Sequence, residues 1–358
     1  MVAAPVFHPL RVADVRPETD DAVSITFEVP DDLAADYRYL PGQHVTLRAL
    51  IDGEDVRRSY SICANANDGV LRVGVKRLPG GVFSTYATTA LQAGDTLEVM
   101  PPVGEFTISP DPANARHYGA VAAGSGITPV LALVATVLEA EPQSRFTLLF
   151  GNRAARSIMF LEELEGLKDR YPDRFHLIHV LSRESGAVPM FSGRLDADRL
   201  TQLFDVIVDT DTVDDWYLCG PFEMVQAARQ VLEARGVPGS NIHDELFFAG
   251  PLDAADLPPE PVDEAGAVTI TFTVDGRSST TRMRPGTSIL DAALRVRGEL
   301  PYSCKGGMCA SCKARVLEGT VEMDKNYALV EEDLNAGFVL TCQAHPTSDA
   351  VVVDFDQR

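Results

Sequence analysis

The sequence predicts three parts of different fold class: an antiparallel β-barrel, a doubly wound parallel α/β sheet and a small α+β domain. Three observations predict this division. One-sided strand patterns fill the first 110 or so residues, strands alternate with helices from about residue 115 to 248, and strand patterns return after an acidic, proline-rich stretch. At 358 residues the chain is long enough for two or three domains.

The first part is predicted to be the barrel because its apolar residues alternate with polar ones. Val23, Ile25, Phe27 and Val29 follow the two-residue period of a strand with one buried face. Further runs, separated by turn residues, are expected at 45–51, 58–63, 71–77 and 97–100. Short strands at this spacing are typical of a barrel or sandwich. We place this domain at residues 1–112.

The second part changes to alternating strands and helices. Apolar strands are expected at 118–123, 146–150, 175–181 and 216–219, and helices at 129–139, 159–168, 195–203 and 222–235. Such alternation is typical of a parallel sheet with helices on both faces. We place this domain at residues 113–248.

Residues 249–265 are predicted to be a linker, because they hold four prolines, five acidic residues and no basic residue. The third domain, which we place at residues 266–358, begins with an alternating strand at 268–274 and ends with an apolar run at 351–355. We expect the linker to make this domain a tethered module.

Composition excludes some classes of partner. The net charge of −21 argues against nucleic acid and anionic membranes, which both need concentrated positive charge. The apolar helix around residues 130–138 is too short to span a bilayer, and the first residues lack the pattern of a signal peptide. Cys63 and Cys219 lie far apart and suggest no disulfide framework, so we expect a reducing cytoplasm.

The strongest motif is a set of four cysteines. Cys304, Cys309 and Cys312 are spaced by four and two residues, and Cys342 follows after 29 more. This is the plant-type spacing for a 2Fe–2S cluster. Four thiolates also suit zinc, but zinc sites usually have two short Cys-x2-Cys pairs, and this chain has one. The sequence therefore favours an iron–sulfur cluster and electron transfer, with a structural zinc site as the alternative.

A glycine-rich turn predicts a dinucleotide site. Gly124-Ser125-Gly126-Ile127-Thr128-Pro129 joins the first strand of the second part to its first helix, where exposed backbone N–H groups attract a pyrophosphate. Other candidate residues follow the later strands, at the edge where such sheets bind ligands. They are Asn152 and Arg153, then Ser182 and Arg183, then Cys219, Gly220 and Pro221. Arg153 and Arg183 suit the 2′-phosphate of NADPH, although surface arginines without a ligand are an equal alternative.

The barrel carries candidate flavin residues. Arg58, Ser59, Tyr60 and Ser61 combine a cation, an aromatic ring and hydroxyls on one strand. Residues 80–85 are typical of a turn into a short helix, which is a second anion site. Each pattern alone is only modest evidence, because an Arg–Tyr pair on a strand is more often plain surface.

Together these motifs resemble the ferredoxin–NADP reductase superfamily with a C-terminal plant-type 2Fe–2S domain. Residues 58–61 are similar to its R-x-Y-S motif, 81–84 to its G-x-x-S motif, 124–129 to G-x-G-I-x-P, and 219–221 to C-G-P. The resemblance implies a flavin barrel, a nucleotide domain and a β-grasp ferredoxin domain. It also implies FAD, a 2Fe–2S cluster and NADPH as cofactors, with NADH as the alternative to NADPH.

The resemblance implies roles for particular residues. Ser61, Thr128 and Cys219 are expected near the reacting flavin and nicotinamide rings. The cluster ligands are expected to be Cys304, Cys309, Cys312 and Cys342. The cofactor-binding residues are expected to be Arg58, Ser59, Tyr60, Ser61, Lys76, Gly81, Phe83, Ser84, Gly124, Ser125, Gly126, Thr128, Asn152, Arg153, Ser182, Arg183, Cys219, Gly220, Pro221 and Phe247.

Within the superfamily, the chain resembles the reductase subunits of phenylacetyl-CoA epoxidases, with Phe191-Ser192-Gly193-Arg194-Leu195-Asp196 as the discriminating stretch. This implies an oxygenase of phenylacetate degradation as the electron acceptor. The reductases of 3-ketosteroid 9α-hydroxylases and of other ring-hydroxylating oxygenases are the alternatives. A non-enzymatic electron carrier is a further alternative from a different class.

Overall fold

A computed structural model describes residues 7–184, 188–246, 268–274, 276–284, 286–297, 300–302, 305–308 and 310–357. The predicted linker at 249–265, and with it Phe247, Cys304 and Cys309, lies outside the described residues. The chain divides into two compact units, one of residues 8–56 and 60–250 and one of residues 251–358 together with 1–7 and 57–59, and each is described by itself. Within the described ranges no helix has the length and apolar character needed to cross a membrane.

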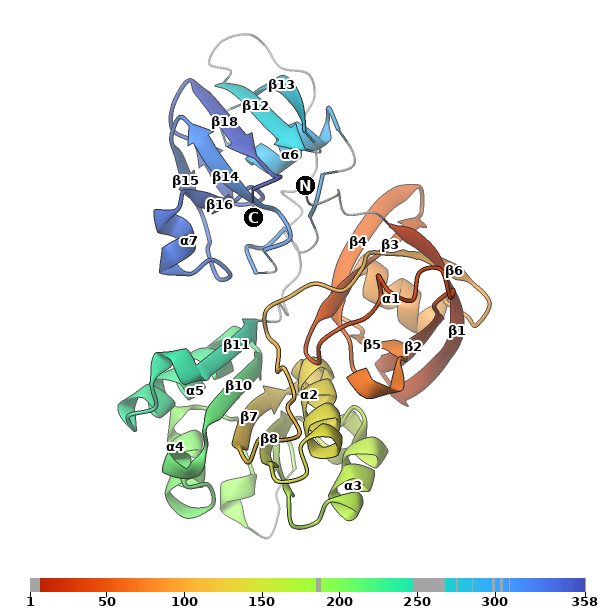
Figure 1. Cartoon of the computed structure of the whole chain (residues 1–358), viewed down its shortest axis with the longest axis vertical. Coiled ribbons are helices and arrows are strands. Elements are labelled where there is room, and N and C mark those ends of the chain that lie inside the picture. Colours follow the sequence, from red (N-terminus) through yellow and green to blue (C-terminus); the bar gives the residue numbers. More distant parts are fainter. Residues whose placement is uncertain are drawn as a thin grey trace. The chain divides into compact units, whose positions relative to one another are not determined.

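The first sheet is a six-stranded antiparallel barrel, as predicted (Figure 1). Its order is β4-β3-β6-β1-β2-β5, and a bridge between Ile62 and Val73 joins the end of β4 to β5. Its core includes Ile25, Leu47 and Phe83. The elements are β1 (His8–Thr19), β2 (Ala22–Glu28), β3 (His44–Ile51), β4 (Glu54–Ser61), η1 (Ala66–Asp68), β5 (Leu71–Lys76), α1 (Val82–Thr89) and β6 (Thr96–Val99).

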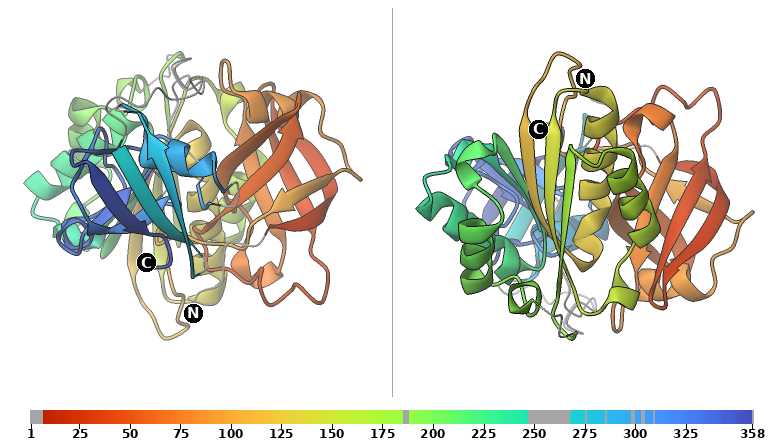
Figure 2. Two further views of the ribbon diagram at one scale, coloured as in Figure 1. Left: turned by 90° about the horizontal axis from the view of Figure 1, so that it is seen from above. Right: turned by 90° about the horizontal axis from the view of Figure 1, so that it is seen from below.

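The second sheet is fully parallel, with the order β11-β10-β7-β8-β9. Helices α2 and α3 cover one face and α4 and α5 cover the other (Figure 2). This confirms the predicted doubly wound fold. The strands are β7 (His117–Ala123), β8 (Arg145–Asn152), β9 (Phe175–Leu181), β10 (Asp215–Gly220) and β11 (Ile242–Leu246). The helices are η2 (Gly124–Gly126), α2 (Ile127–Ala140), η3 (Ala155–Ser157), α3 (Leu161–Arg170), η4 (Pro189–Phe191), α4 (Ala197–Val206), η5 (Thr210–Thr212), α5 (Phe222–Ala234) and η6 (Gly239–Asn241).

Capping explains where two helices differ from the expected ranges. The carboxylate of Asp196 accepts a hydrogen bond from the Arg199 N–H, so α4 begins at Ala197, two residues later than predicted. Phe160 has a φ of 57°, which delays the start of α3 to Leu161. Strand β11 was not predicted, because its sequence Ile-His-Asp-Glu-Leu lacks a continuous apolar run.

The barrel and the parallel sheet pack directly on each other within one unit. A Cβ atom on Gly74 of β5 would lie 2.6 Å from Thr128 Cγ2 and 3.0 Å from Phe160 Cζ. Beside this contact, Arg72 Nη2 donates to both carboxylate oxygens of Glu163 at 2.9 Å. Close packing and a half-buried ion pair therefore fix the seam on which the candidate site lies.

The C-terminal unit is a mixed five-stranded sheet with the order β13-β12-β18-β14-β16, in which only the β12–β18 pair is parallel. Its core includes Phe272, Ile289 and Phe355. This matches the predicted α+β class. The elements are β12 (Val268–Val274), β13 (Arg277–Met283), α6 (Ile289–Leu294), β14 (Lys313–Glu318), β15 (Val321–Met323), α7 (Glu331–Asn335), β16 (Phe338–Leu340), β17 (Ala344–Pro346) and β18 (Ala350–Asp354).

Candidate functional site

A buried serine and a glutamate connect the barrel to the parallel sheet. Ser61, at the end of β4, donates a hydrogen bond of 3.0 Å from Oγ to Oε2 of Glu245 on β11. The Nδ1 atom of His44 lies 3.7 Å from the other carboxylate oxygen. Ser61 and His44 are 2% and 7% exposed. Because Glu245 Oε2 accepts the Ser61 hydrogen, the serine oxygen presents lone pairs to any ligand on its other side.

Cys219 lies next to this group. On the parallel strands β10 and β11, Cys219 is in register with Glu245. The thiol is fully buried, and its burial, followed by the nearby charges of Glu245 and Asp244, raises its pKa far above the usual range. Cys219 is therefore a neutral thiol, suited to lining a site rather than attacking a substrate.

The glycine-rich turn is pressed against the same strand end. Gly124, Ser125 and Gly126 form η2, and a Cβ atom on Gly126 would lie only 2.1 Å from the carbonyl oxygen of Cys219. The Thr128 hydroxyl donates to the Ser125 carbonyl at 3.0 Å. Helix α2 begins directly after the turn, so its first N–H groups and its positive end lie at the edge of the sheet.

Four more predicted nucleotide residues lie at this edge. Backbone hydrogen bonds run from Ser182 to Asn152 at 2.9 Å and from Arg183 to Arg153 at 2.8 Å. Arg153, Ser182 and Arg183 are exposed. Asn152 is 8% exposed, and its buried Nδ2 atom has no hydrogen-bond partner among the described residues. A buried amide donor without a partner fits a site that a polar ligand completes.

The flavin motif brings two aromatic rings together. Arg58, Ser59 and Tyr60 on β4 are half-buried, and the Tyr60 ring lies 5.5 Å from the ring of Phe83 on α1. Arg58 Nη1 donates to the Arg57 carbonyl at 2.6 Å. An aromatic ring face, a guanidinium and a helix N-terminus are groups that suit an isoalloxazine and its phosphates.

Ser84 and Lys76 have partners within the barrel. The Ser84 hydroxyl accepts from the Leu78 N–H at 3.1 Å and donates to the Gly81 carbonyl at 3.3 Å, which closes the turn before α1. A Cβ atom on Gly81 would lie 2.4 Å from this hydroxyl. Lys76 Nζ lies 3.5 Å from a carboxylate oxygen of Asp21. A direct role of Ser84 and Lys76 in holding FAD stays a prediction.

Two of the four motif cysteines, Cys312 and Cys342, lie within the described residues and are close together. Cys312 and Cys342 are 3% and 7% exposed, and the N–H and hydroxyl of Thr341 both donate to the Cys312 carbonyl, at 3.2 and 2.9 Å. Lys305 and Ala310 have φ values of 50° and 51°, so the loop is tightly curled.

A side chain in the same loop fits a bound cluster. The Ser311 hydroxyl is buried and has no hydrogen-bond partner in the part of the chain that the structure describes. A hydroxyl donor next to Cys312 fits a cluster whose sulfur atoms accept hydrogen bonds. The loop therefore suits a 2Fe–2S cluster, which would be held by Cys304, Cys309, Cys312 and Cys342.

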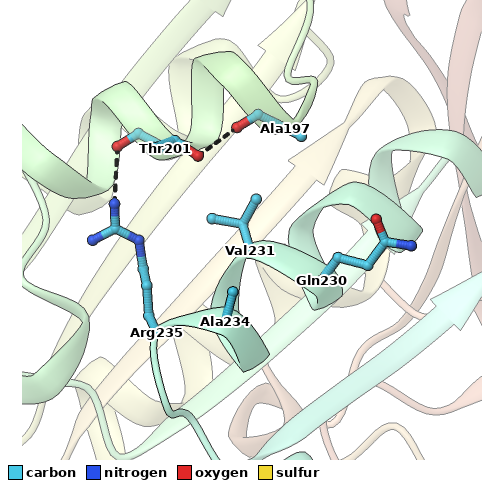
Figure 3. Close-up of a pocket in the computed structure, with 6 residues that line it drawn as sticks. All are labelled: Ala197, Thr201, Gln230, Val231, Ala234 and Arg235. Atoms are coloured by element: carbon cyan, nitrogen blue, oxygen red, sulfur yellow. Dashed lines mark hydrogen bonds between the residues drawn. The ribbon is translucent and has the colours of Figure 1, made fainter.

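A hollow between α4 and α5 does not belong to this site. It is lined by Ala197, Thr201, Gln230, Val231, Ala234 and Arg235 (Figure 3). Arg235 Nη2 donates to the Thr201 carbonyl at 3.2 Å. No residue predicted to bind a cofactor lines this hollow.

Sequence reasoning missed His44 and the contact of Glu245 with Ser61. Glu245 lies in a stretch that the family resemblance singled out, but nothing local indicates that its side chain reaches the barrel. His44 belongs to no motif, and only the tertiary fold brings this residue, at the start of β3, near Glu245 on β11.

We predict that Ser61→Ala slows flavin reduction by NADPH. Ser61 is predicted to form a hydrogen bond to the flavin ring as this ring gains charge. A hydrogen bond to a charged group is worth about 1.5–3 kcal/mol, so loss of this bond in the transition state lowers the rate of flavin reduction roughly tenfold to a hundredfold. Stopped-flow measurement of flavin absorbance after mixing with NADPH gives this rate.

Ser144→Ala is the matched control for this prediction. Ser144 is a buried serine that donates to Glu141 at 2.7 Å just before β8, at the end of the sheet opposite the site. Its removal is expected to lower stability and to leave the rate of flavin reduction unchanged. Equal rates in the two variants would contradict a special role of Ser61.

The fold and the site define a class of protein: an NAD(P)H oxidoreductase that carries a flavin and an iron–sulfur cluster. The chain matches the family models of the oxidoreductase FAD-binding domain over residues 9–108, the oxidoreductase NAD-binding domain over 120–230, and the 2Fe-2S iron-sulfur cluster binding domain over 272–347. The chain belongs to the ferredoxin–NADP reductase superfamily, in the branch with a C-terminal ferredoxin domain.

Two relatives are similar over nearly the whole chain. One of the subunits of the 1,2-phenylacetyl-CoA epoxidase of Escherichia coli (strain K12) is 45% identical over 98% of this chain and 98% of that protein. The 3-ketosteroid-9-alpha-monooxygenase, ferredoxin reductase component, of Rhodococcus rhodochrous is 35% identical over 97% of this chain and 96% of that protein.

Solved structures agree with the fold. Phthalate dioxygenase reductase, a modular structure for electron transfer from pyridine nucleotides to [2Fe-2S], matches with a TM-score of 0.62 at 22% identity, over 98% of each chain. The FAD/NAD binding domain of a nitric oxide dioxygenase from Vibrio cholerae O1 biovar El Tor matches with a TM-score of 0.58 at 27% identity, over 67% of this chain and 98% of that one.

Proposed function

We propose that this protein is the reductase component of a phenylacetyl-CoA epoxidase in aerobic phenylacetate degradation. It takes electrons from NADPH and delivers them singly to the oxygenase component. The observation that carries this proposal is the 45% identity with the E. coli epoxidase component over 98% of both chains.

Each domain is proposed to bind one cofactor and to carry out one step of the electron transfer. FAD, when bound, supplies the conversion of a two-electron hydride donor into a one-electron donor. The hydrogen bond between Ser61 and Glu245 lies beside the reacting flavin ring. Cys219, as a neutral thiol, lines the site of the nicotinamide ring. The Gly124–Gly126 turn and the α2 N-terminus bind the pyrophosphate. The cysteine loop holds the cluster through which electrons leave.

The test is a reconstituted reaction. The purified protein, NADPH and a phenylacetyl-CoA epoxidase oxygenase are incubated with phenylacetyl-CoA, and the ring epoxide is measured by mass spectrometry. The proposal expects NADPH-dependent epoxide formation. No epoxide, together with NADPH-dependent support of a 3-ketosteroid 9α-hydroxylase, would assign the protein to the second candidate, which the 35% identical relative favours.

We propose NADPH rather than NADH as the electron donor, and Arg183→Ala tests this preference. Arg153 and Arg183 are exposed neighbours at the end of the sheet and suit the dianionic 2′-phosphate that only NADPH carries. A charge-assisted contact is worth about 1.5–3 kcal/mol, so KM for NADPH should rise roughly tenfold or more, and KM for NADH should stay unchanged. Steady-state kinetics with an artificial acceptor measure both constants.

Arg170→Ala is the control for the nucleotide preference. Arg170 is an exposed arginine in the last turn of α3, away from the strand ends. It should change neither constant. An equal rise for both nucleotides in Arg183→Ala would contradict a 2′-phosphate contact.

We further propose that the domains meet at 112/113, 248/249 and 265/266, and that the protein acts in the cytoplasm. Cys63 and Cys219, which the cluster does not use, are buried and lie far apart in the chain, which supports a reducing compartment.

A further inference from the structure

The ferredoxin domain has two edges of opposite charge. The order of its sheet places β13 at one edge and β16 at the other (Figure 1). Arg277 and Arg282 lie on β13, and Arg284, Arg295 and Arg297 lie in the segments around α6, which packs beside β13. Residues 277–297 thus hold five arginines and one acidic residue.

The opposite edge is acidic. Residues 313–333 hold six acidic residues and three basic ones. Of the basic residues, Lys313 forms an ion pair with Asp333. Glu322, Glu331 and Glu332 are exposed, as is Lys325. The β16 edge therefore carries a local surplus of negative charge, although the whole domain is nearly balanced.

Three large apolar side chains are exposed at this acidic edge. Tyr327, Val330 and Leu334 are 37%, 60% and 42% exposed, and we call them the β16-edge patch. The Leu334 N–H donates to the Val330 carbonyl, so these two residues lie one turn apart at the start of α7. Exposed apolar groups that cluster with polar neighbours mark interaction surfaces.

The patch is tied to the cluster loop. The Tyr327 N–H donates to the Gly307 carbonyl at 3.0 Å, and a Cβ atom on Gly307 would lie 2.9 Å from the Lys325 carbonyl. The segment that bears Tyr327 therefore packs directly on the loop that holds the cluster. A protein bound to this patch lies beside the exit point of the electrons.

Building on the proposed function, we infer that the β16-edge patch docks the oxygenase component, which presents an apolar contact surrounded by basic residues. Charge decides between the possible occupants. Residues 1–250 hold 35 acidic and 21 basic residues, so the reductase domains of this chain or of a second copy would bring like charge to this edge. The arginine edge of a second copy would bring opposite charge, but the net charge of −21 on each chain opposes such self-association. A separate protein with a basic surface is the occupant that the charge favours.

A charge reversal tests the inference in the full-length, cofactor-loaded protein. Glu331→Lys/Glu332→Lys is compared with Arg277→Glu/Arg282→Glu at the opposite edge. The patch variant should raise KM for the oxygenase roughly tenfold and remove most of its salt dependence, because rim charges act on encounter. The arginine variant should leave KM unchanged. The reverse ranking, or no change in either variant, would overturn the inference.

A second pair of variants tests the apolar part of the patch. Val330→Ser/Leu334→Ser should also raise KM for the oxygenase, and Val296→Ser, which removes a valine that is 47% exposed outside the patch, should not. Equal KM values in both would overturn the apolar contact. Because these side chains are on the surface, loss of folding does not confuse the result.

Two further measurements distinguish the oxygenase from the other possible partners of the patch. Single-turnover reduction of the cluster by NADPH should be equal in all variants, and a slower rate in the patch variants would assign the patch to the flavin side instead. Sedimentation should show no self-association through the patch; a wild-type dimer that the patch variants abolish would assign it to a second copy. A wild-type protein that reduces neither candidate oxygenase would refute the proposed function, and the inference with it.

Discussion

Replacing Gly126 with alanine should reduce the rate of flavin reduction by NADPH at least roughly a hundredfold. The new Cβ atom would lie 2.1 Å from the Cys219 carbonyl oxygen, which is a backbone atom and cannot rotate away. Either the glycine-rich turn or the end of β10 must move, and both are predicted to bind the dinucleotide. A displacement of about 1 Å in a reacting pair can cost a hundredfold in rate.

Gly166→Ala is the control for this substitution. Gly166 lies within α3, and an added Cβ atom would meet nothing within 4 Å. Alanine there should stabilise the helix by up to about 1 kcal/mol and leave the rate unchanged. FAD content and thermal unfolding show whether Gly126→Ala still folds. A folded, FAD-containing Gly126→Ala protein with the wild-type rate would contradict the placement of the nucleotide at this turn.

The second large effect is expected for Cys342→Ala. This change removes one of the four thiolates predicted to hold the cluster, so the protein should lose its iron and its iron–sulfur absorbance. Electron delivery to the oxygenase should fall to the background of the assay, while NADPH still reduces the flavin. Iron content, visible absorbance and epoxide yield measure the three effects.

Cys63→Ala separates loss of a ligand from loss of a buried thiol. Cys63 is fully buried in the barrel domain, and burial raises its pKa to about 12, so it is a neutral core side chain. Its replacement should keep the full iron content and the electron transfer to the oxygenase. A Cys342→Ala protein with a complete cluster would contradict the proposed ligand set.

Much of the fold could be predicted because its signals are local. Alternation in strands such as β2 and β12, and the strand–helix rhythm of the second part, are properties of short windows of sequence. The cofactor sites could also be predicted from local signals, because glycines and cysteines at fixed spacing are typical of sites for phosphates and for iron. Helix boundaries were less certain, because the Asp196 cap and the left-handed Phe160 shift them by two residues.

The parts that could not be predicted depend on contacts between distant segments. Glu245 reaches Ser61 across 184 positions in sequence, and His44 joins them from a third strand. The hydroxyls of Thr128 and Ser84 bind nearby backbone groups in the structure, although a motif alone suggests that they contact a ligand. Motifs therefore predicted where the site lies, whereas tertiary packing determines which polar atoms of the site are available to bind a ligand.

In the proposed function, electrons pass in one order, from NADPH to the flavin, then to the cluster, then to the oxygenase. Anaerobic stopped-flow mixing with NADPH, with flavin absorbance and freeze-quenched electron paramagnetic resonance of the cluster followed together, tests it most directly. We expect that flavin reduction comes first, that cluster reduction follows, and that the reduced cluster is oxidised only when the oxygenase is added. Cluster reduction by NADPH in protein stripped of FAD, or a cluster that stays oxidised while the flavin is reduced, would contradict it.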